Sequence, residues 1–230
     1  MPKHGKRYRE AAAKVDKSRF YGVDEAIALA KEIHPARFDE TVELHIKTGL
    51  DPRHAEQQIR GSTVLPHGLG KVMRVLVFAE GEAAAAAREA GADYVGSDDL
   101  IKQIEGGFLD FDVAIATREM MGKVGRLGRI LGPRGLMPNP RSGTVVGAED
   151  IARSVQEAKQ GRVEFRLDRL ANIHVPLGKV SFEDQKLKEN MAALIEAVNA
   201  AKPKEAKGQY IRSCLLYTSD AADDLLCVDL

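Results

Sequence analysis

The chain has 230 residues, 44% of them hydrophobic, which is enough for one large domain or two modest ones with buried cores. No apolar run approaches the roughly 20 residues needed to span a bilayer, and no signal-peptide core follows the lysine-rich start, so we expect a cytoplasmic protein without a membrane partner. The 34 basic and 34 acidic residues cancel, which at face value argues against a nucleic-acid partner.

This zero net charge averages over unlike segments. Residues 214–230 contain four aspartates and no lysine or arginine, so residues 1–213 carry a net charge of +4. The same segment holds both cysteines, Cys214 and Cys227. Their spacing leaves a disulfide open, but an otherwise cysteine-free chain of intracellular type favours unpaired thiols.

The first part of the chain predicts two helices and a strand. The helices are expected over residues 10–17 and 23–33, and Pro35 ends the second one. Over residues 41–50 apolar side chains alternate with polar ones, which is the period of a half-buried strand. Residues 50–70, rich in proline and glycine, are expected to be an irregular crossing between domains.

The middle of the chain has a different pattern. Strands that are apolar on both faces alternate with helices, which is typical of a parallel sheet covered on both sides. We expect strands at 72–79, 93–95 and 111–116, and helices at 82–90, 98–105 and 151–161.

Residues 131–140, LGPRGLMPNP, are too rich in glycine and proline for a helix or a strand and predict a shaped loop. Cations recur among glycines just before and along it, and cations beside bare backbone amides suit phosphate. An alternative is a surface loop whose cations serve solubility or pair with Asp98, Asp99 and Glu119. The candidate cations are Lys123, Arg126, Arg129, Arg134 and Arg141.

After Gly161 the alternating pattern returns. Residues 162–168 and 172–175 predict two half-buried strands, joined as a hairpin by a turn at 169–171. Ser181 and Asp184 have the spacing of a capping box, which would open a helix that closes near residue 202.

Two segments with alternating, half-buried strands therefore flank a segment whose strands are apolar on both faces. This order indicates one domain inserted into a second. We predict an outer domain of residues 1–68 and 158–213 and an inner domain of residues 69–157. The inner domain would carry a net charge of −2 and the outer domain +6.

Three segments carry a resemblance to a known family. FDETVELHIKTGLDPRHAEQQIRGSTVLPHGLGK, LGRILGPRGLMPNPRSGTV and GRVEFRLDRLANIHVPLGKVSF resemble the L-one family of large-subunit ribosomal proteins, bacterial type, over about residues 20–213. The resemblance implies an α/β protein of two domains. A discontinuous outer α+β domain would have split βαβ character, and a Rossmann-like three-layer inner domain would be inserted into it.

The resemblance also implies function. The family binds a mobile stalk of large-subunit ribosomal RNA beside the site where deacylated tRNA leaves the ribosome, and in bacteria it represses translation by binding its own mRNA. A cytoplasmic, non-enzymatic RNA-binding protein without a cofactor or metal is therefore expected.

The outer domain shows a physical basis for this role. Polar residues of the strands at 41–50 and 162–168 could form one mixed-charge face, on which cations neutralise phosphates and carboxylates accept hydrogen bonds from ribose hydroxyls. Phe38 matches the aromatic residue that the family places against RNA, although core packing against helix 23–33 is the alternative. For the polar face the alternative is a solvated surface, and for His174 a structural role. The candidates are Phe38, Thr41, Glu43, Lys47, Arg53, Arg162, Glu164, Arg166, Asp168 and His174.

Enzymatic alternatives find little support in the motifs. In HGLGKV (67–72), Val72 replaces the Ser or Thr of a P-loop, and no GxGxxG follows the strand at 72–79. The histidines are scattered, without metal-ligand spacing. A two-domain enzyme that binds a small molecule or nucleotide in an interdomain cleft, and a purely protein-binding factor, remain as alternatives.

Residues 214–230 depart from the family, whose members continue with a strand of small residues that contributes RNA contacts. CLLYTSDAADDLLCVDL is acidic, and its first residues resemble a translated sequencing adapter. We expect this segment to be a non-native junction.

Overall fold

The computed structural model describes residues 9–10, 13–16, 19–34, 36–206, 208–218 and 226–228. The chain divides into two compact units. Unit 1 comprises residues 1–70 and 163–230, and unit 2, residues 71–162, is inserted into it. The helix expected at 10–17 lies partly outside the described residues, which are helical at 9–10 and 13–14.

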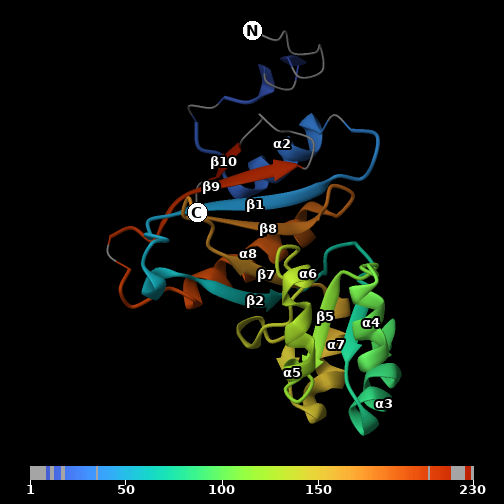
Figure 1. Cartoon of the computed structure of the whole chain (residues 1–230). Coiled ribbons are helices and arrows are strands. Elements are labelled where there is room, and N and C mark those ends of the chain that lie inside the picture. Colours follow the sequence, from blue (N-terminus) through green and yellow to red (C-terminus); the bar gives the residue numbers. More distant parts are fainter. Residues whose placement is uncertain are drawn as a thin grey trace. The chain divides into compact units, whose positions relative to one another are not determined.

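Unit 1 is built around a four-stranded sheet in the order β10-β9-β1-β8 (Figure 1). Strands β8 and β9 both run antiparallel to β1, so they are parallel to each other with β1 between them. Helix α8 joins β8 to β9, which makes a split βαβ unit. The elements are α2 (Val23–Ile33), β1 (Thr41–Thr48), η1 (Ala55–Gln57), β2 (Arg60–Val64), β7 (Arg162–Arg166), β8 (Asn172–Lys179), α8 (Asp184–Ala200), β9 (Ile211–Thr218) and β10 (Leu226–Val228).

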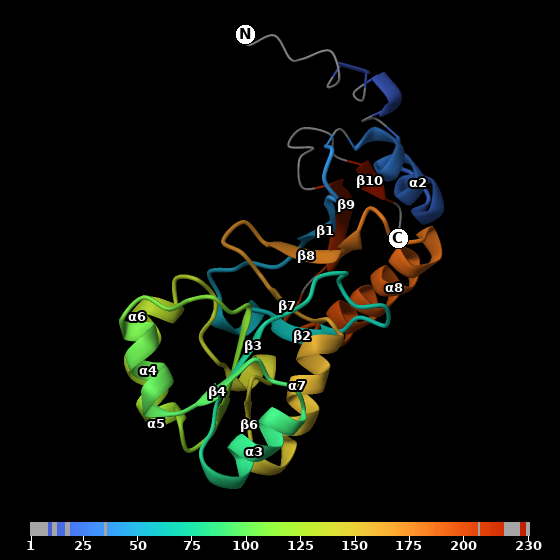
Figure 2. The same cartoon turned by 90° about the vertical axis from the view of Figure 1, so that its right-hand side faces the viewer.

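Helices α2 and α8 cover the same face of the sheet (Figure 2). Strand β1 alternates as predicted, with Val42, Leu44 and Ile46 at most 1% exposed. These side chains share one hydrophobic cluster with Ile27 of α2 and Leu194 of α8. Because successive side chains of a strand point to opposite faces, this burial fixes which residues of β1 face away from the helices.

A second, two-stranded sheet pairs β2 with β7. The expectation of an irregular crossing over 50–70 was therefore wrong for residues 60–64. Every residue of β2 is half-buried, so the alternation that identified the other strands is missing there. Gly61 allows close packing, because a Cβ atom at this position would lie 2.6 Å from Cζ of Phe165. The predicted hairpin of β7 and β8 is reduced to one bridge, Leu167 to Ile173, beyond which the strands enter different sheets.

Unit 2 has a parallel sheet in the order β4-β3-β5-β6 with helices on both faces (Figure 2). Leu76 and Phe78 of β3 pack in one cluster with α4 and residues 124–131, whereas Val75 and Val77 pack in another with α3 and α7. The expected three-layer arrangement is confirmed. The elements are β3 (Val75–Phe78), α3 (Gly81–Glu89), β4 (Tyr94–Gly96), α4 (Asp98–Glu105), β5 (Val113–Thr117), α5 (Met121–Val124), η2 (Gly125–Leu127), α6 (Gly128–Leu131), η3 (Pro140–Ser142), β6 (Val145–Val146), η4 (Ala148–Asp150) and α7 (Ile151–Gln160).

The second boundary between the units falls after Arg162 rather than after residue 157. Ile151, Val155 and Ala158 anchor α7 to the sheet of unit 2, and Gly161, with φ 104°, ends the helix in the left-handed region. The shift brings Lys159 and Arg162 into unit 2. Its formal net charge is therefore zero instead of the predicted −2.

The cation-bearing segment that leads into the glycine-rich loop is helical rather than irregular. Elements α5, η2 and α6 follow one another from Met121 to Leu131. Val124, Leu127 and Leu131 are fully buried. In a helical run, the sequence spacing that separates the cations by three residues also places these apolar residues on one side of the helix. The irregular loop begins at Gly132 and ends at the short helix η3.

The predicted capping box of helix α8 needs correction, and the C-terminal segment has a defined place in the sheet. Helix α8 forms, but Ser181 does not cap it, because the Ser181 hydroxyl donates to Asp39 Oδ2 at 2.7 Å and the N-cap is Glu183. The segment from Cys214 to Thr218 completes β9, and a non-native origin of residues 214–230 stays a prediction. Cys214 is a buried free thiol opposite Ile46, and burial raises its pKa to about 12.

Asn190 of α8 connects three parts of unit 1 and is fully buried. Its Nδ2 donates to the carbonyl oxygens of Gly68 at 3.0 Å and Leu177 at 2.7 Å, and its Oδ1 accepts from the backbone N–H of His67 at 3.0 Å. The amide thus ties the segment before unit 2 and strand β8 to the helix.

We predict that Asn190→Ala lowers the stability of unit 1 by about 2–4 kcal/mol, because it leaves buried backbone groups without partners and opens a cavity. Hydrogen exchange of the β1 and β8 amides measures this for unit 1 alone. Asn199→Ala, on the exposed side of the same helix, is the matched control and should change stability by less than about 0.5 kcal/mol. Equal exchange rates in both variants would contradict the role assigned to Asn190.

Candidate nucleic-acid interface

The face of the four-stranded sheet opposite α2 and α8 is the candidate site, and we call it the open face. The alternation of β1 and the register of its neighbours decide which side chains it carries. Residues directly opposite in adjacent strands point to the same side. The open face includes Thr41, Glu43, His45, Lys47, Asn172, His174, Pro176, Lys179, Ser213, Leu215 and Tyr217.

Aromatic rings occupy the centre of the open face. His45 and His174 lie opposite each other, with ring centroids 4.4 Å apart in an edge-to-face arrangement. The ring of Tyr217 stacks on the other side of His45 at 5.1 Å. Three strands thus contribute to one row of rings, and such rings offer planar surfaces to nucleobases or riboses.

A carboxylate accompanies each histidine. Nε2 of His45 lies 3.2 Å from Glu43 Oε2, and Nε2 of His174 lies 3.2 Å from Asp168 Oδ2. The hydrogen bond from His45 is the main reason that the pKa of Glu43 is lowered. Carboxylates on this face therefore stay ionised and can accept hydrogen bonds from ribose hydroxyls and base amino groups.

Asp168 organises the turn between β7 and β8. Its Oδ1 accepts from the backbone N–H groups of Leu170 and Asn172, both at 2.7 Å. Burial raises the pKa of Asp168, but the hydrogen bonds from the Asn172 backbone, from His174 and from the Leu170 backbone together lower it below its ordinary value. We expected Asp168 on the polar side of a strand. It lies in a turn and reaches the open face through His174.

The ends of the open face carry two predicted candidates. Thr41 Oγ1 accepts from Lys179 Nζ at 2.9 Å, and Lys47 Nζ donates to the Leu170 carbonyl at 2.6 Å. Phe38 precedes β1 and is 61% exposed, so the alternative of core packing is wrong for this ring. Arg53 is also exposed, in the loop after β1.

The strand β7 does not join the open face, because β1 pairs with β8 and β9 and β7 pairs with β2. The predicted meeting of β1 and β7 side chains was therefore wrong. Arg162 belongs to unit 2, where its guanidinium lies 3.3 Å from Glu157 and its side chain is only 16% exposed. Glu164 pairs with Arg60 at 3.2 Å, and Arg166 is exposed on β7.

The five candidate cations predicted around the glycine-rich loop of unit 2 fall into two groups. Lys123 lies 2.8 Å from Glu80 and 3.2 Å from Asp98, and these hydrogen bonds raise its pKa, so part of the pairing alternative holds. The remaining four are exposed, and their side chains form no ion pair with any residue that the structure describes. They are Arg126, Arg129, Arg134 and Arg141.

The candidates predicted from the sequence do not include three residues of the open face, His45, Asn172 and Tyr217. His45 alternates with Glu43 and Lys47, so the period of β1 was a sufficient signal for it. Tyr217 could be found only from the pairing of β9 with β1, because local periodicity does not say which strands become neighbours.

The open face suits binding more than catalysis. It combines cations, carboxylates and rings that are exposed or half-buried over three strands, and its described residues include no nucleophile held by a base in the arrangement that covalent catalysis needs. Among the residues described, no group of three or more His, Cys, Asp or Glu side chains could hold a metal ion. The described helices include none that is both long and apolar enough to cross a membrane.

Comparison with known proteins decides the family. The model of the ribosomal protein L1p/L10e family matches residues 29–222, which is most of the chain. The chain belongs to this family. The match extends past Cys214 and so includes the first residues of the segment that we expected to be unrelated.

Several L1p/L10e relatives cover nearly the whole chain. Large ribosomal subunit protein uL1 of Chloroflexus aggregans (strain MD-66 / DSM 9485) is 64% identical over 217 residues, which are 94% of this chain and 92% of the relative. The uL1 of Dehalococcoides mccartyi (strain ATCC BAA-2100 / JCM 16839 / KCTC 5957 / BAV1) is 60% identical, over 95% of this chain and 92% of the relative. The uL1 of Thermomicrobium roseum (strain ATCC 27502 / DSM 5159 / P-2) is 59% identical, over 93% and 89%.

L1p/L10e membership settles the class of the protein. The family and the relatives are named as ribosomal proteins. This chain is therefore a ribosomal protein that takes part in translation, and it is not an enzyme. The alternative of a nucleotide-binding enzyme is therefore wrong.

The carboxylates of Glu43 and Asp168, each beside a histidine of the open face, predict how unit 1 responds to acid. The folded pKa values of Glu43 and Asp168 lie below their unfolded values, so each group adds stability above the unfolded pKa of about 4, and this is lost as the pH falls through the folded value. The double variant Glu43→Gln, Asp168→Asn should therefore lose less unfolding free energy than the native chain between about pH 5 and 2.5. Urea unfolding over a pH series, with the exposed Glu205→Gln as control, measures this. A steeper acid loss in the double variant would contradict it.

Proposed function

We propose that the open face of this protein, a constituent of the large ribosomal subunit in the cytoplasm, binds the mobile stalk of the subunit's ribosomal RNA, near the site where deacylated tRNA leaves. The observation that carries the proposal is the row of His174, His45 and Tyr217 rings with a carboxylate on each histidine. This combination suits folded RNA, which presents phosphates, ribose hydroxyls and unstacked bases together.

Different side chains of the open face would recognise different chemical groups of the RNA. Lys47, and Lys179 beside Thr41, supply positive charge for phosphates at opposite ends of β1. The exposed ring of Phe38 lies before the Thr41 end, where it is available to a base or a ribose. Glu43 and Asp168 select against ligands without hydrogen-bond donors, because an ionised carboxylate repels a bare phosphate chain.

Unit 2 has a secondary role in the proposal. Arg126, Arg129, Arg134 and Arg141 are exposed and flank or lie within the glycine-rich loop. Because their guanidinium groups have no carboxylate partner among the described residues, they remain available to the phosphates of tRNA. Arg166 and Glu164 of β7 are further candidates for RNA contact outside the open face.

We predict that a gel-shift titration with a stalk-derived rRNA fragment shows tighter binding than with a scrambled hairpin, and that affinity falls with salt. Phe38→Ala and His174→Ala should each cost about 1–2 kcal/mol, because each removes a surface for a base or ribose. Arg126→Gln, in unit 2, serves as the matched surface control and should cost less. Equal affinity for both RNAs would refute specific stalk binding.

We further propose that the same open face binds the protein's own mRNA and represses its translation. In a cell-free system, added protein should reduce synthesis from a reporter that carries the leader of this message and spare an unrelated reporter. His174→Ala should relieve the repression in proportion to its loss of rRNA affinity, because one surface serves both RNAs. Full repression by a variant that no longer binds the stalk fragment would contradict a shared site.

A further inference from the structure

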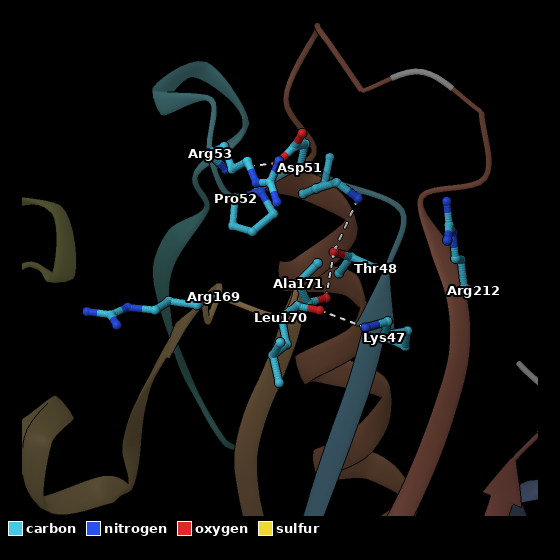
Figure 3. Close-up of a pocket in the computed structure, with 10 residues that line it drawn as sticks. Lys47, Thr48, Asp51, Pro52, Arg53, Arg169, Leu170, Ala171 and Arg212 are labelled. Carbon is cyan, nitrogen blue, oxygen red and sulfur yellow. Dashed lines mark hydrogen bonds between the residues drawn. The ribbon is translucent and has the colours of Figure 1, made fainter.

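A hollow of about 320 Å³ lies where β1 ends, beside the turn that joins β7 to β8 (Figure 3). Its lining includes Lys47, Arg53, Arg169 and Arg212, against the single carboxylate of Asp51. The hollow belongs entirely to unit 1. Lys47 also belongs to the open face, so the hollow continues that surface past the end of the sheet.

The floor of the hollow is held in one conformation. Ala171 has a φ of 64°, which a residue with a side chain rarely adopts, and its carbonyl accepts from both the backbone N–H and the hydroxyl of Thr48 at 2.9 Å. Asp168 fixes the N–H of Leu170, and Lys47 Nζ holds the Leu170 carbonyl. A surface fixed in this way loses little entropy when a ligand binds.

The wall on the β9 side depends on the absence of a side chain at Gly49. The N–H of Gly49 donates to the Tyr210 carbonyl at 2.8 Å. A Cβ atom on Gly49 would collide with the Gln209 carbonyl and lie 3.2 Å from Nε of Arg212. The Arg212 side chain, which lines the hollow, thus occupies the space beside Gly49.

Arginines lie on both sides of Leu170. Figure 3 shows Arg169 on one side, with its side chain directed away from the other labelled residues, and Arg212 on the opposite side, with Leu170 and Lys47 between them. Leu170 is 70% exposed, which is unusual for a leucine whose backbone is so firmly held. The Asp51 carboxylate is partly engaged, because its Oδ1 accepts from the Arg53 N–H at 3.0 Å. Positive charge on two sides of an apolar centre matches a nucleotide better than a free anion.

We propose that the hollow is a subsite for one unpaired nucleotide of the bound RNA. The base packs on Leu170 and Pro52, and the phosphates before and after it lie near Arg169 and Arg212. Lys47 connects this nucleotide to the RNA on the open face. The inference rests on the proposed RNA-binding function and adds to it a site beyond the open face.

The test measures binding of the full chain to the stalk-derived rRNA fragment over a salt series. Arg169→Gln and Arg212→Gln should each weaken binding about three- to ten-fold and reduce the slope of log affinity against log salt by about 0.7–1, because each removes a phosphate contact. Leu170→Ser should weaken binding about three- to five-fold without changing the slope, since it removes apolar contact only. All three side chains are exposed, so the variants are expected to fold.

A second measurement identifies the nucleotide. Abasic residues are placed one at a time at the unpaired positions of the fragment. One position should weaken binding to the native chain, and the same position should have no further effect on Leu170→Ser, because residues in contact are not additive. Lys186→Gln, on α8, is the control for loss of a cation elsewhere in unit 1.

Three outcomes would overturn the subsite. These are native affinity in all the hollow variants, weaker binding in the arginine variants without an effect of Leu170→Ser, and the lack of any abasic position coupled to Leu170. Failure of the subsite is distinguishable from failure of the proposed function. In the first case Phe38→Ala and His174→Ala still weaken stalk binding, and in the second the stalk fragment and the scrambled hairpin bind equally.

Discussion

The alternation of β1 is the constraint on which the rest of unit 1 depends. Val42, Leu44 and Ile46 face the helices and are at most 1% exposed, so Glu43, His45 and Lys47 must face away from them. A slip of one residue would reverse both sets, burying charges and exposing the core. The hydrophobic effect that stabilises the sheet therefore also determines the order of the polar groups. Because β1 is paired on both edges, this order is transmitted to β8 and β9, and three separate segments of chain present one continuous surface.

The turn from Asp168 to Asn172 extends this control beyond the sheet. A residue with a positive φ costs on the order of 1 kcal/mol or more, and Ala171 is kept there by Thr48, whose N–H and hydroxyl both donate to its carbonyl. Asp168 satisfies the N–H groups of Leu170 and Asn172 and also holds His174. One carboxylate thus positions a ring of the open face and the exposed leucine of the hollow. The local strain is placed between two candidate contact surfaces, where a fixed backbone is useful for recognition.

Much of this fold is predictable from local periodicity, and the failures share a physical origin. Helix α2, the alternation of β1 and the layers of unit 2 follow from side-chain patterns within a few residues. Strand β2 does not, because its residues are all half-buried and its partner β7 is a hundred residues away in the chain. The open face was only partly predicted for the same reason. The polar residues of β1 were identified, but the pairing with β8 rather than β7 depends on contacts that no local pattern encodes. Ser181 shows that tertiary contacts override spacing, since Asp39 takes the hydroxyl that a capping box requires.

In strand β9, the positions that stabilise the fold differ from the positions that are available for binding. Its backbone hydrogen bonds to β1 do not depend on the side chains, and its inward positions require only residues that pack, a condition that Cys214 and Leu216 meet at about 1% exposure. This explains how residues that we expected to be foreign complete the sheet. The outward positions are under no such requirement from the core, yet Tyr217 lies there against His45. Exchange of outward residues on β9 therefore leaves the framework of β1 and β8 in place and changes the chemistry of the open face.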